Sequence, residues 1–151
     1  MLKNMRNQCG ETIVEVLICI AILSIGLGTS FLISGQASKT SISNEAEFQA
    51  QLYANQQINY LQQYLKSSSI NPDVRSRSNY SFCLNYDYGA QNYSLNSSCV
   101  KKSPTLGVEF TVLIVNKGYV SGRLFNTYDI KVTWQNTFST NINTVEIAYG
   151  A

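Results

Sequence analysis

Apolar residues gather in one long block near the start of the chain. From Val16 to Ser38 there are 23 consecutive residues without a charge, and the stretch Val16 to Leu27 is the most apolar part. At about 1.5 Å per residue, a helix of this length crosses a hydrocarbon core of about 30 Å. The pattern therefore predicts a membrane-spanning helix.

Beyond this block the pattern remains helical but becomes amphipathic. The stretch Asn44 to Ser68 has no Pro or Gly, and its apolar residues recur at helical spacing with Gln and Asn mostly elsewhere. The residues of this stripe are Ala46, Ala50, Tyr53, Ile58, Leu61 and Leu65. We expect one helix from Glu11 to Lys66, whose outer half packs on a folded domain.

The last third of the chain alternates between apolar and polar residues with period two. This pattern predicts strands at 108–115, 128–135 and 144–149, with a turn at 116–118. In the second strand one face carries Tyr128, Ile130, Val132 and Trp134, and the opposite face carries Asp129, Lys131 and Thr133. We therefore predict an α+β fold in which a small antiparallel sheet is covered on one face by the helix, with Trp134 in the core.

Residues 67–105 are rich in Ser and Asn and contain Pro72 and Pro104, so they are expected to form a connecting loop with one or two short strands. Four tyrosines lie in this stretch, and they suit either an adhesive surface or a cap on the sheet. They are Tyr80, Tyr86, Tyr88 and Tyr93.

Two of the four cysteines also lie in this polar stretch. Cys83 and Cys99 have 15 residues between them, a spacing that suits a structural disulfide worth about 3 kcal/mol by loop entropy. A zinc site would need more ligands, and the chain has no histidine. A redox pair would more typically be Cys-x-x-Cys. Cys19, inside the apolar block, is expected to behave as a small apolar residue.

Composition argues against an enzyme and against nucleic-acid binding. The formal net charge is only +2, and no basic run with interleaved aromatics occurs. Without histidine the chain lacks the commonest general base and metal ligand. Glu45 and Glu47 are its only close carboxylates outside the N-terminal segment, and they point to different sides of the helix. We expect no catalytic site, no metal and no cofactor.

Lys3 and Arg6 precede the apolar block, so the positive-inside rule places the N-terminus in the cytoplasm and the rest of the chain outside. A cleavable secretory signal, cut near Gly35-Gln36-Ala37, is one alternative. Two acids, Glu11 and Glu15, argue against it because such signals carry almost none there. A plain single-span anchor is another alternative, but it leaves unexplained a carboxylate just inside an apolar segment.

The residues around these acids resemble a known N-terminal signature. Gly10 is followed by "ETIVE" and then by "VLICIAILSIGL". This arrangement, over about residues 6 to 34, is similar to the N-terminus of type IV pilins and the related pseudopilins. In that family a membrane peptidase cuts a short basic leader after its final glycine. The fifth residue of the mature chain is then a glutamate, and the first is usually phenylalanine.

The resemblance implies cleavage between Gly10 and Glu11, loss of Cys9 with the leader, and pairing of Glu15 with the new α-amine of a neighbouring subunit. Glu11 departs from the family pattern, which puts N-methylation of that amine in question. The family often loses helical structure near residues that correspond to Gly26 and Gly28, and each glycine weakens a helix by about 1 kcal/mol. The implied organisation is a leader at 1–10, a membrane and assembly half of the helix at 11–38, an amphipathic half at 39–66 and a head at 67–151, in the lollipop shape of pilins.

The function that the resemblance implies is that of a pilin, with a lean toward a minor subunit, in a type IV pilus-like filament. The alternatives are a pseudopilin of a secretion or DNA-uptake system and a membrane-anchored binding protein that never polymerises. Implied partners are other pilin subunits, prepilin peptidase, an inner-membrane assembly platform with its ATPase, and lipid before assembly. A host or surface ligand is left open, and nucleic acid enters only through an uptake role.

Overall fold

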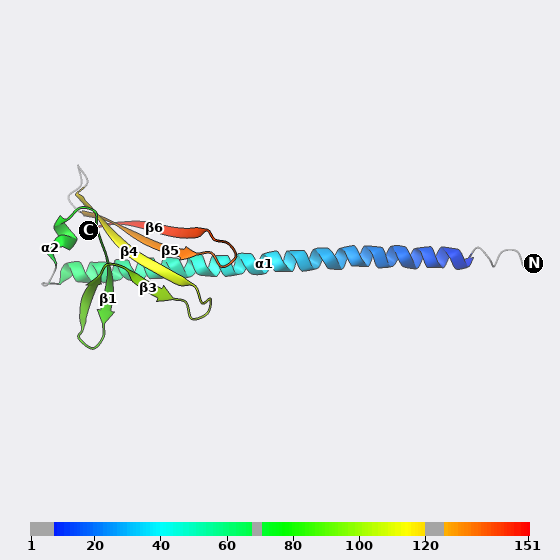
Figure 1. The fold of residues 1–151 in the computed structure, drawn as a ribbon, viewed down its shortest axis with the longest axis horizontal. Helices are drawn as coiled ribbons and strands as arrows, with labels where there is room; N and C mark the ends of the chain where they lie inside the picture. Colours follow the sequence, from blue (N-terminus) through cyan, green and yellow to red (C-terminus); the bar gives the residue numbers. More distant parts are fainter. Residues whose placement is uncertain (1–7, 68–70, 120–125) are drawn as a thin grey trace, which may run out of the picture. The chain divides into compact units, whose positions relative to one another are not determined.

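A computed structural model describes residues 8–67, 71–119 and 126–151, with only the backbone of residues 8–12 and 119. The chain divides into two compact units, Met1–Ser41 and Ile42–Ala151. The helix α1 (Gln8–Lys66) contributes to both units. Its end at Lys66 confirms the predicted boundary, and its start lies three residues before Glu11 (Figure 1).

In the first unit, every side chain that the structure describes belongs to α1. From Ile13 to Ser41 all of these side chains are exposed. A helix with an apolar surface and no protein cover needs either lipid or other helices around it.

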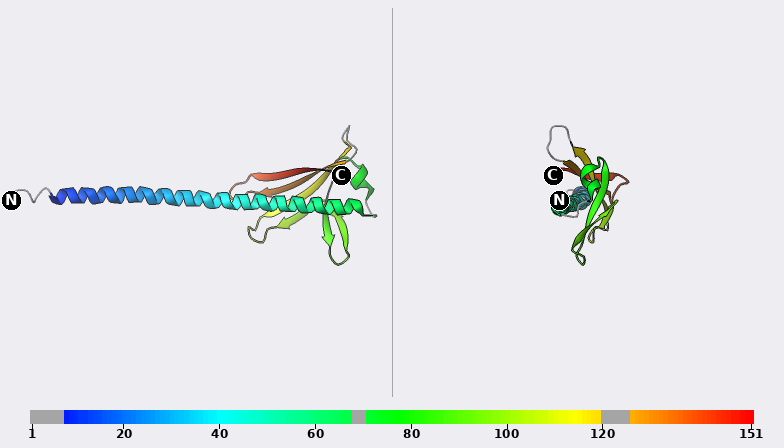
Figure 2. Two further views of the ribbon diagram at one scale, coloured as in Figure 1. Left: turned by 180° about the vertical axis from the view of Figure 1, so that it is seen from behind. Right: turned by 90° about the vertical axis from the view of Figure 1, so that its left-hand side faces the viewer.

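The second unit contains a short helix, α2 (Pro72–Ser76), and the described strands of one antiparallel sheet. The strands are β1 (Tyr80–Asp87), β2 (Asn92–Asn96), β3 (Cys99–Lys102), β4 (Glu109–Tyr119), β5 (Asn126–Gln135) and β6 (Ile142–Gly150). Their order is β2-β1-β4-β5-β6, and β3 pairs with the early part of β4. The predicted α+β fold, with the helix packed on an antiparallel sheet, is confirmed (Figures 1 and 2).

The outer half of α1 lies on the sheet through the predicted stripe. Ala46, Ala50 and Leu61 are buried, and the other predicted stripe residues are partly buried against the same core. The small alanine side chains allow the helix to lie close to the sheet. The ring of Tyr53 packs on the ring of Phe110 in β4, with a centroid distance of 5.3 Å. The sheet contributes the buried face that was predicted for β5: Tyr128, Ile130, Val132 and Trp134.

Sequence reasoning missed one polar residue at this interface. Gln57 is buried, donates from Nε2 to the carbonyl of Leu84 at 2.9 Å and accepts from the Leu84 amide at 3.0 Å. An amide at this position satisfies both backbone groups of a buried strand residue. The helix and β1 are therefore held in register by hydrogen bonds as well as by apolar packing.

The predicted turn at 116–118 is wrong, because β4 continues through these residues to Tyr119 and pairs with β5 around a bulge. Asn116 is buried, donates from Nδ2 to the Val74 carbonyl at 2.7 Å and accepts from the Gly118 amide at 2.7 Å. Gly118 has a φ of 76°, which favours glycine. The Asn and Gly that suggested a turn form an internal bulge instead.

The expectation of a loop with one or two short strands at 67–105 is also wrong. This stretch holds α2 and three strands, β1, β2 and β3. Asn71 caps α2 by accepting from the Asp73 amide, Pro72 occupies its first turn, and Val74 is fully buried. In β1 the buried side chains Phe82, Cys83 and Leu84 are consecutive instead of alternating, and α2 buries only Val74, so neither element shows a regular apolar period.

Candidate functional site

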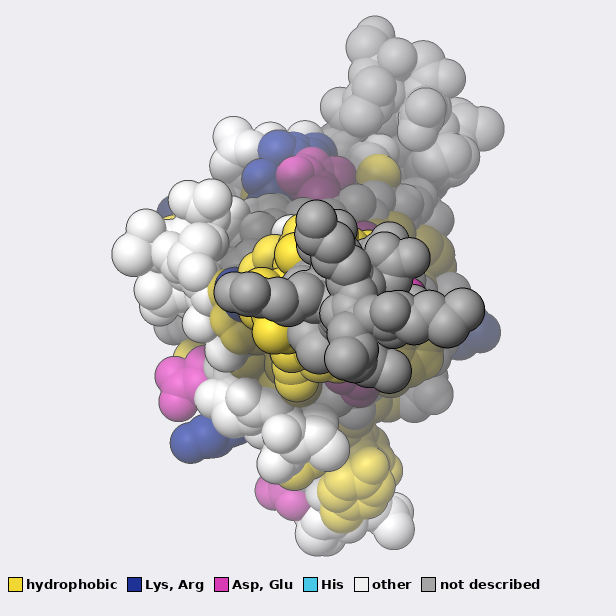
Figure 3. Space-filling view, turned by 90° about the vertical axis from the view of Figure 1, so that its right-hand side faces the viewer, with side chains coloured by type: hydrophobic (Ala, Val, Ile, Leu, Met, Phe, Trp, Pro, Cys, Tyr) yellow, Lys and Arg dark blue, Asp and Glu magenta, His cyan; other side chains and the backbone are white. Residues whose placement is uncertain are grey.

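The apolar surface of α1 is the most unusual feature of the chain. Its large apolar side chains between Ile13 and Ile33 have exposed fractions from 54% at Ile18 to 76% at Phe31. Among the described residues, α1 is the one helix long and apolar enough to cross a membrane. In Figure 3 yellow apolar side chains surround the helix where it is visible. A patch of this size marks a contact with lipid or protein.

Glu15 is the only charged residue on α1 between Ile13 and Ser38, and its side chain is exposed. Neither an ion pair nor a hydrogen bond satisfies its carboxylate within the described chain. In hydrocarbon a carboxylate costs about 2.5–3.5 kcal/mol even on lenient scales. A cationic partner from outside the chain would remove much of that cost.

Three hydroxyl groups of the apolar segment, in contrast, are satisfied within the helix. Ser24 Oγ donates to the Ile20 carbonyl at 2.7 Å, and both Thr29 and Ser30 donate to the Gly26 carbonyl, at 3.0 and 2.8 Å. Such bonds make hydroxyls tolerable in lipid, but they weaken and bend helices slightly. Together with Gly26 and Gly28, they make residues 24–30 the least helix-favouring part of the segment.

The predicted cleavage site lies in the first turn of α1 that the structure describes. Gly10 and Glu11 are helical there, and only their backbone is described. A protease needs an extended substrate, so cleavage requires this turn to unwind. Glycine lowers the cost because it stabilises a helix by about 1 kcal/mol less than alanine does.

The predicted disulfide is present. Cys83 of β1 and Cys99 of β3 are bonded with a Cα–Cα distance of 5.9 Å, and both are buried. The bond joins two strands that each pair with a different half of β4. Among the described residues Cys19 is the one free cysteine, and it is exposed on α1. No three His, Cys, Asp or Glu in the described ranges gather as metal ligands.

Replacing Cys83 and Cys99 together with alanine is expected to lower the free energy of unfolding by about 3 kcal/mol, since the crosslink no longer restricts the unfolded chain. Urea denaturation of the full chain in mild detergent measures this change, with Cys19→Ala as the matched control. An unchanged midpoint for the double variant would contradict a structural role. Mass spectrometry of non-reduced protein should find the two residues linked.

The predicted tyrosine cluster forms only in part. Tyr86, Tyr88 and Tyr93 come together on the β1–β2 hairpin and meet Tyr60 and Tyr64 of α1. Partial burial raises the pKa of both Tyr60 and Tyr93. The Tyr93 hydroxyl donates a hydrogen bond to Gln63 Oε1. The cluster ties the hairpin to the helix, and Tyr88 remains 80% exposed.

Tyr80 is not part of this cluster. Its ring stacks on Phe82 at 5.6 Å, with the Arg77 guanidinium 5.8 Å from its centroid. Whether any of the tyrosines serves adhesion stays an open prediction.

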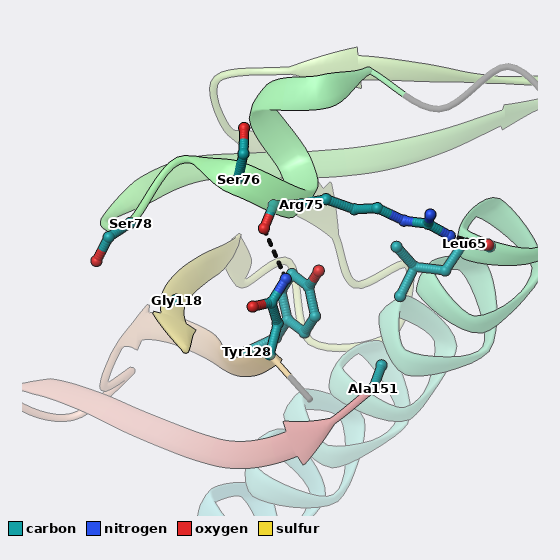
Figure 4. Close-up of a pocket in the computed structure, with 8 residues that line it drawn as sticks. Leu65, Arg75, Ser76, Ser78, Gly118, Tyr128 and Ala151 are labelled. Atoms are coloured by element: carbon teal, nitrogen blue, oxygen red, sulfur yellow. Dashed lines mark hydrogen bonds between the residues drawn. The ribbon is translucent and has the colours of Figure 1, made fainter. Parts of the chain in front are cut away.

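A surface pocket of about 770 Å³ lies between the end of α1, α2 and the C-terminal end of β6 (Figure 4). Its polar groups are already used within the protein. Arg75 Nη2 donates to the Leu65 carbonyl at 2.9 Å, and Asn126 Nδ2 donates to the Arg75 carbonyl at 2.6 Å. Tyr128 OH donates to the Val74 carbonyl at 3.2 Å, and burial raises its pKa. These bonds indicate a structural role for the pocket walls.

Comparison with known protein families gives one match. Residues 5–31 match the family described as the prokaryotic N-terminal methylation motif, which is characteristic of prepilin-type cleavage in type IV pilins and pseudopilins. No curated protein and no solved structure matches the chain significantly. The match covers Gly10, Glu11 and Glu15 together, whereas the sheet is outside it.

Proposed function

We propose that this chain, which carries the prepilin-type N-terminal motif, is a structural subunit of a type IV pilus-like filament. Type IV pilins and pseudopilins are structural proteins, and the long apolar helix fits membrane anchoring before assembly. In this proposal prepilin peptidase cuts between Gly10 and Glu11. The membrane then holds the processed chain until α1 packs among the helices of other subunits.

The position of Glu15 on the apolar helix is the observation that supports the proposal most directly. It is a lone carboxylate on a helix whose apolar surface is exposed throughout the segment. Cleavage after Gly10 creates an α-amine on each subunit, and a Glu15–amine pair between neighbours neutralises two charges that are costly in hydrocarbon. Pairing favours assembly and also fixes the axial register of the helices.

A second consequence concerns residues 24–30. We propose that helical structure around Gly26 and Gly28 loosens in the filament, since two glycines and three hydroxyls bonded to backbone carbonyls lower its helical preference. Neighbouring α1 helices would then pack against a more adaptable segment.

A pseudopilin of a secretion or DNA-uptake system is the second candidate, because the same motif serves both classes. We favour a pilus-like filament with this chain as a minor subunit. The unusual residue Glu11, which would be the first of the mature chain, supports this assignment. Its partners would be other subunits, the peptidase and an assembly platform with its ATPase, with the head outside the cell.

Shearing of intact cells tests the proposal. The wild-type chain should appear in the sheared filament fraction, and its N-terminal sequence should begin Glu-Thr-Ile-Val. Membranes from the same cells provide the reference amount. A chain found only in membranes would favour a non-polymerising anchored protein, and a mature start near Ser38 would restore the secretory-signal interpretation.

A further inference from the structure

The loop between β5 and β6, residues 136–141, lies at one end of the second unit. At the opposite end, Tyr128 near the start of β5 lines a pocket with Leu65 of α1. Trp134, near the end of β5, instead lines a pocket with Ser43 of α1. The strand therefore runs back along α1, and the loop that follows it, here called the hairpin loop, lies near the beginning of the unit. Figures 1 and 2 show this loop at the end of the sheet opposite the C-terminus.

Chain length places the same end of the unit close to the membrane surface. The uncharged segment from Val16 to Ser38 makes about 34 Å of helix, slightly more than a hydrocarbon core of about 30 Å. Ile42, where the second unit begins, follows Ser38 by four residues. Four residues rise about 6 Å in a helix and extend at most about 14 Å in any conformation. Because the headgroup region is about 5–8 Å thick, the unit begins at the membrane surface while the chain is anchored.

The hairpin loop and its flanks are uncharged and expose two large apolar side chains. From Val132 to Val145 there are 14 consecutive residues without a charge. Phe138 in the loop is 48% exposed, and Ile142, the first residue of β6, is 73% exposed. Lipid would cover both side chains without removing any charge from water.

The backbone of the hairpin loop is also suited to a surrounding that is poor in water. The Asn136 amide donates to the Asn141 carbonyl at 3.0 Å, and the Ser139 amide donates to the Asn136 carbonyl at 3.4 Å. The Asn136 side chain accepts from the Phe138 amide at 2.8 Å, and the Ser139 hydroxyl accepts from the Asn141 amide at 3.3 Å. Unsatisfied amides are costly in lipid, so these four bonds lower the cost of inserting the loop.

We propose that the hairpin loop is a second membrane contact, in which Phe138 and Ile142 enter the headgroup region of the bilayer while α1 anchors the chain. The inference rests on the membrane-held stage of the proposed function. Because the loop is neutral, the contact does not require anionic lipid. Two attachments hold the head in one orientation on the membrane until the subunit enters a filament.

Quenching of tryptophan fluorescence by brominated lipid tests this contact in the full chain. Phe138→Trp and Tyr88→Trp are reconstituted separately into phosphatidylcholine vesicles whose acyl chains carry bromine close to the glycerol end. Tyr88 is the matched control because it is an exposed aromatic residue, and its hairpin meets α1 at Tyr60, roughly 25 Å beyond Ser43 along the helix. The wild-type chain, with Trp134 as its one tryptophan, gives the background emission.

Phe138→Trp should lose about half of its added emission in brominated vesicles, compared with unbrominated ones, because its ring lies among the lipids. The added emission of Tyr88→Trp should be unchanged. Combining Ile142→Glu with Phe138→Trp should restore the emission, since a carboxylate resists entry into lipid.

Vesicle-bound Phe138→Trp with emission as insensitive to bromine as that of Tyr88→Trp would overturn the inference and leave the filament function intact. Quenching that Ile142→Glu does not reduce would also overturn it. A blue shift without quenching would indicate cover by a second copy of the chain in place of lipid, with the same consequence. A wild-type chain that does not float with the vesicles would overturn both this contact and membrane anchoring.

Discussion

Glu15→Ala is expected to remove the chain from filaments while leaving it in the membrane. Alanine is cheaper in lipid than a carboxylate, so anchoring is retained or strengthened. Charge-assisted hydrogen bonds are worth about 1.5–3 kcal/mol each, which corresponds to a 10- to 100-fold weaker contact at every subunit. Quantitative immunoblots of sheared and membrane fractions measure the effect, and processing is checked by the mass of the membrane form.

Two control variants show whether the loss of assembly comes from the charge of Glu15, from the size of its side chain, or from the removal of any carboxylate on α1. Glu15→Gln keeps the shape and should assemble nearly as poorly as Glu15→Ala, because the partner amine loses its counter-charge. Glu47→Ala removes another exposed carboxylate of α1, in its polar half, and should assemble like wild type. Normal filament levels of Glu15→Ala would rule out the pairing role.

Gly10→Val is expected to leave the chain unprocessed. The resemblance implies that the peptidase requires a small residue before the cut, and a β-branched side chain would also crowd the backbone that must enter the enzyme. All of the protein should then remain in the membrane with its leader attached, about ten residues heavier. Because no free amine forms at Glu11, Glu15 loses its proposed partner and assembly should fail as well.

Gly10→Ala serves as the matched control, since alanine is the smallest change and should permit at least partial cleavage. Intact-mass measurement of membrane fractions distinguishes the two forms. A Gly10→Val chain that still begins at Glu11 would show that this bond is not recognised through its glycine.

The sequence predicted those elements in which burial follows a regular pattern. The stripe from Ala46 to Leu65 repeats at helical spacing, and β5 alternates cleanly, so both were predicted correctly. The strand β2, Asn92–Asn96, has only two partly buried side chains, Tyr93 and Leu95, and its hairpin is held by tyrosines from α1. Contacts of this kind join distant residues and leave no local pattern.

The candidate site divides in the same way. Gly10, Glu11 and Glu15 are recognisable from local spacing, because the roles proposed for them depend on position along one helix. The tyrosine cluster, in contrast, depends on where the β1–β2 hairpin meets α1, which brings Tyr93 against Tyr60 and Tyr64, and the local sequence does not show this. Likewise the sequence of Asn116 and Gly118 is typical of a turn, but a hydrogen bond from Asn116 to the Val74 carbonyl, 42 residues away, holds Asn116 within β4.

Immunogold electron microscopy of wild-type cells tests the filament claim most directly, with antibodies raised against the head (residues 67–151). The account predicts gold particles on filaments that project from the cell, sparse or terminal for a minor subunit and continuous for a major one, and their loss in cells that carry Glu15→Ala. Gold confined to the cell envelope in wild-type cells, with unlabelled filaments beside it, would contradict the account.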